Sequence, residues 1–177
     1  MKKILIASLF AAAVSPALVH AADGTLSFTG RVDANTCVLT SGTNGTQTVG
    51  MSPVNAASLS QAGDVAGLTP FNVTLGNCGN TLKSVRLDFA DQTNVDLATG
   101  RLKNTARENS NIQIALLDGP NATSAFRLGT PSAQTTPVTS TTAGAATIPL
   151  AAQYVATGGA ASAGAVTSSI QFTIAYP

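Results

Sequence analysis

Six separate stretches of the chain place apolar residues at every second position, and this pattern constrains the fold more than any other feature. Such alternation predicts β-strands with one buried face. Clusters of Gly, Asn, Pro and Ser separate the stretches and predict turns. We therefore expect an all-β antiparallel sandwich in which each sheet has one polar side. The predicted strands span residues 25–32, 70–78, 84–90, 111–119, 147–156 and 168–176.

Two segments outside these strands have a different character. Residues 57–63 predict a single helical turn, too short to change the fold class. Residues 130–147 are low in complexity and contain two prolines, so we interpret them mainly as an exposed connection. An edge strand within this connection is the alternative.

The N-terminus has the order of features found in a cleavable secretory signal. Lys2 and Lys3 precede an apolar run that ends near small residues at Ala21. The run is shorter than the roughly 20 apolar residues that a membrane-spanning helix needs. We expect residues 1–21 to form the signal peptide, with Ala22 as the alternative last residue. No later segment is both long and continuously apolar, so we expect no direct membrane insertion after cleavage.

The exported part is the size of one domain and carries few charges. Charged residues make up 10% of the chain, and cleavage removes Lys2 and Lys3, which leaves seven basic residues against eight acidic ones. This balance does not indicate nucleic-acid binding. A polar, nearly uncharged surface suits many copies packed closely together.

The two cysteines, Cys37 and Cys78, both lie in the exported part. Thiols pair in the oxidising compartments that exported proteins enter, so we predict a disulfide between them. Closing a loop of this length should stabilise the fold by roughly 4 kcal/mol on the chain-entropy account.

The residue inventory offers little for catalysis. The only histidine, His20, lies in the predicted signal, so the exported chain has no Ser-His or Cys-His nucleophile. The nearest group of carboxylates is Asp88, Asp91 and Asp96, and turn chemistry accounts for the last two. A calcium site formed by Asp91, Asn94 and Asp96 is a weaker alternative because a closing Glu is missing. We expect no catalytic residues, no metal and no cofactor.

Aromatic platforms for sugar binding are also few. The chain has no tryptophan, and both tyrosines, Tyr154 and Tyr176, fall on the apolar faces of predicted strands. We therefore expect both to pack in the core.

Four motifs, in order, carry a family resemblance. They are GTLSFTGRVDANTC, FNVTLGNC, TIPLAAQYVATG and the terminal SSIQFTIAYP. Tyr176 is the penultimate residue, and Gly164 is the fourteenth from the end. From about Gly24 to Pro177 the chain resembles the major pilins of the type 1 fimbrial family, which are assembled by the chaperone-usher route.

The resemblance implies an incomplete immunoglobulin-like sandwich, here residues 33–177, that lacks its last strand. The N-terminal extension of the next subunit, here residues 22–32, would complete it by donor-strand exchange, after a periplasmic chaperone and an outer-membrane usher have handled the subunit. The implied acceptor groove and chaperone or usher contact comprises Gly164, Ile170, Phe172, Ile174 and Tyr176.

The predicted donor strand has bulky side chains on one face. Leu26, Phe28 and Val32 share this face with Gly30, where the missing side chain would admit a close approach. The alternative is that residues 25–36 form the first strand of their own domain. We place the change of role between Phe28 and Val32, so Gly30 and Val32 remain open between the two. The segment before Phe28 is shorter than in many members of the family.

The resulting hypothesis is a structural subunit of a fimbrial shaft on the bacterial surface, exported through the periplasm and polymerising with identical or related subunits. Cell adhesion and biofilm formation would be properties of the whole fibre. One alternative is a minor or adaptor pilin of the same fibre. A freely secreted carbohydrate-binding sandwich is the less favoured alternative, and it would fold alone as a monomer.

Overall fold

The computed structural model describes residues 37–79, 84–106, 111–139 and 144–177, which belong to a compact unit spanning residues 33–177. The predicted signal peptide lies outside these residues. So do the four predicted donor residues, Leu26, Phe28, Gly30 and Val32.

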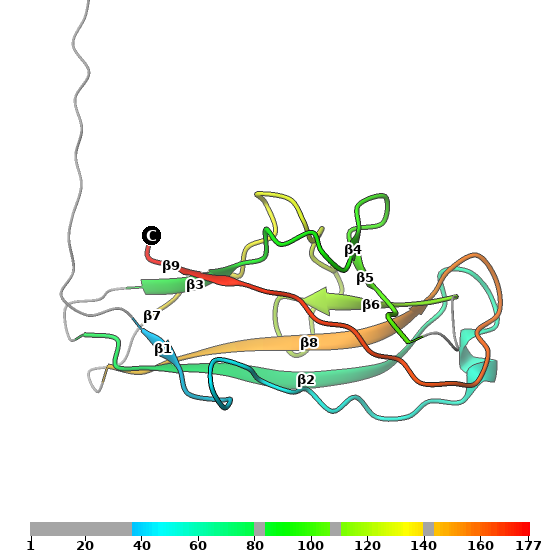
Figure 1. The fold of residues 1–177 in the computed structure, drawn as a ribbon, viewed down its shortest axis with the longest axis horizontal. Helices are drawn as coiled ribbons and strands as arrows, with labels where there is room; N and C mark the ends of the chain where they lie inside the picture. Colours follow the sequence, from blue (N-terminus) through cyan, green and yellow to red (C-terminus); the bar gives the residue numbers. More distant parts are fainter. Residues whose placement is uncertain (1–36, 80–83, 107–110, 140–143) are drawn as a thin grey trace, which may run out of the picture. The chain divides into compact units, whose positions relative to one another are not determined.

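The described residues form two antiparallel sheets (Figure 1). The larger has the strand order β1-β2-β8-β6-β5-β4, and the smaller has the order β7-β3-β9. The predicted all-β class is therefore confirmed. The strands are β1 (Val38–Leu39), β2 (Val65–Gly76), β3 (Ser84–Asp88), β4 (Val95–Asp96), β5 (Arg101–Lys103), β6 (Ile112–Leu117), β7 (Val138–Thr139), β8 (Ala146–Ala156) and β9 (Thr173–Ala175).

Strands β2 and β8 form the long central pair of the larger sheet, with Phe71 opposite Leu150 and Val73 opposite Ile148. Each strand contains a proline, which cannot donate to a ladder. Pro70 is tolerated because β1 pairs only with the far end of β2, at Leu75 and Gly76. Pro149 lies beyond the stretch of β8 that pairs with β6, which ends at Ala151. Both prolines therefore occupy positions where one backbone edge has no strand partner in these ladders.

The core lies between the two sheets. Val85 and Leu87 of β3 are fully buried and belong to the same apolar cluster as Leu75 and Ile148 of the larger sheet. Burial of each such side chain contributes about 1.5–3 kcal/mol. The alternation of buried and half-buried residues along β3 matches its sequence pattern.

The expectation of one polar side per sheet is wrong for β6, because all six of its residues are buried. Ile112, Ile114 and Leu116 are buried on one face, as alternation in residues 111–119 predicts, but Leu117 on the other face is also buried. Gln113, only 7% exposed, donates to Asp96 Oδ2 and accepts from the Thr99 hydroxyl, so its buried amide is paired.

The connection at 130–147 is less exposed than predicted. Ala133 and Thr135 are buried, and Thr135 exchanges hydrogen bonds with the backbone of Leu87: its N–H donates to Leu87 O, and its Oγ1 accepts from Leu87 N–H. The alternative of an edge strand is met by β7, which pairs with β3.

Two smaller predictions are confirmed. The helical turn is a short 3₁₀ helix, η1 (Ala56–Leu59), whose N-terminal Asn55 accepts from Ala57 N–H. Cys37 and Cys78 form the predicted disulfide and join the start of the described chain to the second residue beyond β2.

Candidate functional site at the C-terminal segment

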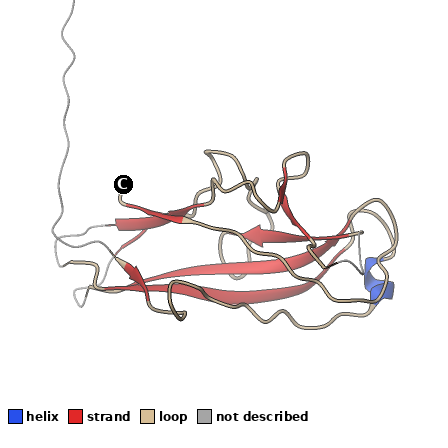
Figure 2. Cartoon of the chain, viewed as in Figure 1, coloured by secondary structure: helices blue, strands red, loops and turns tan. Residues whose placement is uncertain are grey.

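Residues 161–177, here called the C-terminal segment, form a long extended stretch of which only β9 is a regular strand (Figure 2). The even-numbered residues from 166 to 174 are half-buried, while most odd-numbered ones are exposed. Three predicted site residues, Ile170, Phe172 and Ile174, pack against the core from this inner face. The alternation predicted for residues 168–176 therefore continues where no ladder is formed.

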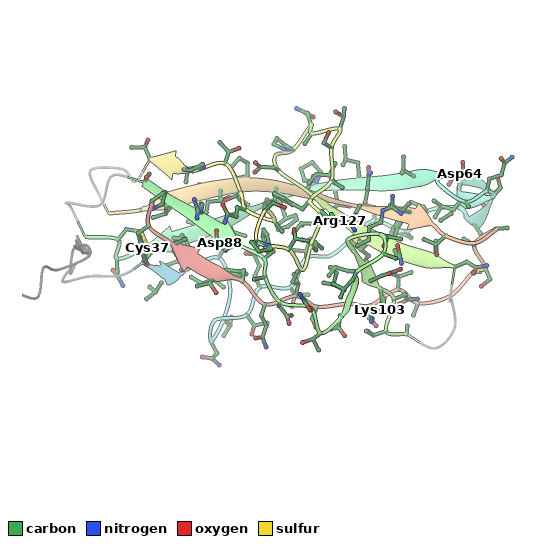
Figure 3. All side chains as sticks on the ribbon, turned by 90° about the horizontal axis from the view of Figure 1, so that it is seen from above. Cys37, Asp64, Asp88, Lys103 and Arg127 are labelled. Atoms are coloured by element: carbon green, nitrogen blue, oxygen red, sulfur yellow. A yellow bond between two sulfur atoms is a disulfide. The ribbon has the colours of Figure 1, made fainter. Side chains whose placement is uncertain are left out.

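The outer backbone edge of the C-terminal segment belongs to the odd-numbered residues. Thr173 and Ala175 pair with Asp88 and Arg86 of β3, as can be followed beside the labelled Asp88 (Figure 3). Nearer the N-terminal end of the segment, Thr105 N–H donates to Thr167 O at 2.8 Å.

Side chains complete this outer edge where β3 ends. Asn104 Nδ2 donates to Ala165 O at 3.2 Å, and Asn104 Oδ1 accepts from Thr167 N–H at 2.9 Å. Asn94 Nδ2 donates to the backbone oxygen and hydroxyl of Ser169. Asp91 Oδ2 accepts from Gln171 N–H at 3.2 Å.

The inner backbone edge is different over residues 166–174, because no described residue pairs with it there. Leu87 exchanges its backbone hydrogen bonds with Thr135, so the Leu87–Ile174 pair is of the non-hydrogen-bonded kind. The backbone groups of Ile174 therefore point away from β3. Residues of the same parity in an extended chain share one edge, so those of 166, 168, 170 and 172 point the same way. The buried Ser168 hydroxyl on this face also has no partner among the described residues.

A second extended segment, residues 47–54, likewise makes no backbone hydrogen bond to any other described residue. This segment runs alongside β2 in Figure 1. The chain that contains it is bonded to the C-terminal segment at two points. Ala161 N–H donates to Leu59 O at 2.8 Å, and Cys37 N–H donates to the Tyr176 hydroxyl at 2.8 Å.

A cavity of about 260 Å³ lies between these two stretches, near the Ala161–Leu59 hydrogen bond. The predicted site residue Gly164 lines it, together with Val166 from the same segment. The remaining walls come from residues 51–59 and from strands β6 and β8. These lining residues include Met51, Val54, Leu59, Ile112 and Tyr154.

Sequence reasoning missed Gly67, which shapes this part of the molecule. Its φ is +67°, and it lies in a β-bulge of β2 between Ala66 and Thr69. A Cβ at this position would come within 2.8 Å of Val54 Cγ1 and 2.9 Å of Tyr154 Cδ2. The bulge interrupts the alternation at residues 65–69, so the predicted strand began only at Pro70. An isolated glycine at the start of the Gly67-Leu68-Thr69-Pro70 stretch was the available signal.

The prediction that both tyrosines pack in the core is wrong for Tyr176. Tyr154 is buried, but Tyr176 is 37% exposed. The Tyr176 hydroxyl is instead the acceptor for Cys37 N–H, so this side chain links the end of the chain to the disulfide-bonded residue. Figure 3 labels Cys37 at this end of the molecule.

Aromatic contacts anchor the middle of the C-terminal segment. The ring of Phe172 lies 6.2 Å, centroid to centroid, from the buried ring of Phe89 in an edge-to-face arrangement. Phe89 in turn lies 5.5 Å from Phe126. Such pairs add about 0.5–1.5 kcal/mol to the burial of the rings.

The carboxylates that the sequence singled out serve as hydrogen-bond acceptors. The Thr93 hydroxyl and N–H, followed by Gln171 N–H, lower the pKa of Asp91. Gln113, followed by Ala98 N–H, lowers the pKa of Asp96. Asp88 pairs with Arg86 at 2.9 Å. The turn chemistry predicted for Asp91 and Asp96 is confirmed, and no metal-binding cluster of His, Cys, Asp or Glu occurs within the described ranges.

Comparison with known proteins identifies the family. Residues 51–177 match the family described as FimA, type-1 fimbrial protein, A. The chain belongs to the type-1 fimbrial protein family. The resemblance predicted from the four motifs is therefore confirmed, and the protein is a fimbrial structural subunit.

Individual relatives agree with this assignment. The fimbrial subunit is 39% identical to the F17 fimbrial protein of Escherichia coli, over 99% of both chains. It is 38% identical to the major fimbrial subunit SMF-1 of Stenotrophomonas maltophilia, over 93% of this chain and 98% of the relative.

Solved structures support the fold of the fimbrial subunit. A chain from a structure of a chaperone-usher pilus matches it with a TM-score of 0.60 over 88% of this chain and 96% of that chain, at 18% sequence identity. The incomplete immunoglobulin-like sandwich expected from the resemblance is thus the observed fold. None of the helices in the described part of the fimbrial subunit is long and apolar enough to cross a membrane.

Proposed function

We propose that this fimbrial subunit polymerises by donor-strand exchange, with residues 22–32 of one copy bound along the C-terminal segment of the preceding copy. One observation carries the proposal. The inner edge of residues 166–174 lacks a backbone partner among the described residues, while its apolar side chains are only half-buried. An incoming strand would supply both missing interactions.

The chemistry of the incoming strand matches this site. β-strand addition obtains affinity from main-chain hydrogen bonds and specificity from alternate side chains. Leu26 and Phe28 alternate in this way, and burial of each would contribute about 1.5–3 kcal/mol. The unpaired backbone of residues 47–54 offers a second edge for the same strand. Gly30 and Val32 would extend the contact if the donor reaches that far.

An unpaired edge beside exposed core residues is a liability in an isolated subunit. We therefore assign a periplasmic chaperone the role of lending a strand before assembly, and an outer-membrane usher the role of exchanging it for the next subunit. The predicted signal peptide would bring the chain to the periplasm. Adhesion and biofilm formation would then belong to the assembled surface fibre.

The test is expression of the exported chain in a periplasm with and without its chaperone, followed by denaturing gels of unboiled samples. We expect soluble subunit only with the chaperone, and a ladder of multimers that collapses on boiling. Recovery of a stable monomer without any chaperone would overturn the proposal.

A substitution assigns the donor face. Phe28→Asp should block polymerisation and leave the chaperone complex intact, because the charge would have to enter an apolar site. Ser27→Asp, on the opposite face of the predicted strand, is the matched control and should still polymerise. Loss of the chaperone complex in Phe28→Asp would instead place Phe28 in the core of its own domain.

A further inference from the structure

Residues 165–171 of the C-terminal segment have no neighbouring strand on their outer edge, yet their backbone groups there are bonded. We infer that Asn104, Asn94 and Asp91 are positioning residues that take the place of that strand and hold the inner edge ready for an incoming one. This inference rests on the proposed function and deepens it.

The β4–β5 hairpin explains how these side chains reach the segment. Val95 pairs with Leu102, and Lys103 N–H donates to Asn94 O at 2.8 Å, so Asn94 and Asn104 both lie at the base of the hairpin. The hairpin is the edge of the larger sheet. Its base therefore connects that sheet to a segment that joins the smaller sheet further along, at β9.

Amide chemistry suits the task. A carboxamide offers one acceptor and donor N–H groups, as a backbone peptide does. Asn104 uses both: its Nδ2 donates to Ala165 O, and its Oδ1 accepts from Thr167 N–H. Asn94 donates to Ser169 O, and Asp91 accepts from Gln171 N–H. The contacts thus recur at every second residue, which is the spacing of a β-ladder.

Binding the outer edge also sets the inner one. Backbone groups of successive residues in an extended chain point to opposite edges. If residues 165, 167, 169 and 171 are fixed on the outer side, residues 166, 168 and 170 must present their N–H and C=O groups to the inner side. The same parity directs Val166 and Ile170 toward the core. The three side chains therefore fix the edge, face and register that strand addition needs.

The experiment compares the chaperone-bound exported subunit with its Asn94→Ala/Asn104→Ala variant. Asn121→Ala is the matched control, because Asn121 is exposed and has no hydrogen bond to a described residue. Hydrogen exchange is measured at Thr167 and along the β2–β8 ladder. The displacement of the chaperone by a synthetic peptide of residues 22–32 is followed on native gels.

We expect faster exchange at Thr167, unchanged exchange along β2–β8, and peptide capture slowed by at least about fivefold, the factor that corresponds to the loss of a single net hydrogen bond. Capture at the rate of Asn121→Ala would overturn the inference. A parallel rise in exchange along β2–β8 would also overturn it, because that pattern means a general loss of stability. If the unmodified subunit itself captures no peptide, the proposed polymerisation fails instead.

Discussion

At the scale of single residues, Gly67 and Tyr176 shape the two stretches that flank the candidate site. One stretch contains residues 47–54, and the other is the C-terminal segment. Gly67 gives β2 a left-handed residue and leaves space that Val54 and Tyr154 occupy. Tyr176 uses its hydroxyl to hold the backbone of Cys37. Neither role depends on apolar alternation, which explains why the sequence pattern did not reveal them.

Gly67→Ala should lower the free energy of unfolding of the exported subunit by more than about 1–2 kcal/mol, the cost of the left-handed conformation alone. The added Cβ would also be too close to Val54 and Tyr154. Urea denaturation measures the effect. Gly45→Ala is the control, because Gly45 has φ +75° and open space around its Cβ position. Equal losses for the two variants would contradict the packing account.

Tyr176→Phe should lower the free energy of unfolding by about 0.5–1.5 kcal/mol, because one hydrogen bond is lost. Amide exchange at Cys37 should become faster, since its N–H loses the hydroxyl acceptor. The hydroxyl of Tyr154 has no hydrogen bond to a described residue, so Tyr154→Phe is the comparison. Unchanged exchange at Cys37 in Tyr176→Phe would show that the bond contributes nothing in solution.

At the scale of elements, the C-terminal segment separates what a sequence pattern reveals from what it leaves out. Alternation correctly predicted that Ile170, Phe172 and Ile174 share the inner face. A regular strand forms only over β9, because β3 ends there and no described strand continues beside it. The bonds from Asn94 and Asn104 join residues about 60–75 positions apart. A local pattern contains no information about such distant polar contacts.

Acid should weaken the attachment of this segment at Asp91. Hydrogen bonds from Thr93 and then Gln171 favour the ionised carboxylate and lower the pKa of Asp91 below its ordinary 3.8. The stabilisation is therefore complete above the ordinary pKa and is lost as the pH falls through the lowered one. NMR should show the Gln171 amide proton shifting in that acidic range. Asp91→Asn, which cannot ionise, should abolish the shift; its persistence in Asp91→Asn would assign the titration to another group.

At the scale of the whole molecule, the sandwich class, η1 and the disulfide followed from alternation, turn residues and export. The burial of β6 on both faces could not be predicted from the sequence. Gln113 is polar and looks like a surface residue, and only the fold brings Asp96 and Thr99 within hydrogen-bond distance of it. The connection at 130–147 was misjudged for a similar reason. Thr135 is a polar residue, but it is buried because its hydroxyl accepts a hydrogen bond from Leu87 N–H.

Cys37→Ser should lower the yield of exported subunit and its free energy of unfolding by roughly 4 kcal/mol, since the closed loop restricts the unfolded chain. The cysteines are 41 residues apart in sequence. The measurement is urea denaturation under oxidising and reducing conditions, which should differ for the unmodified subunit and agree for Cys37→Ser. Identical curves for the unmodified subunit in both conditions would mean that the disulfide does not contribute.

The Ala161–Leu59 and Cys37–Tyr176 hydrogen bonds join the two stretches that flank the candidate site. These bonds also affect how the proposed fibre would respond to force. In the proposed assembly the incoming strand would therefore enter from the side, because these two bonds close both ends of the site. A force along the axis of the bound strand would act on all of its backbone hydrogen bonds and buried side chains at once. Peeling the strand from one end would break these contacts one after another. A fibre assembled in the proposed way would resist tension along the strand better than sideways removal of the strand.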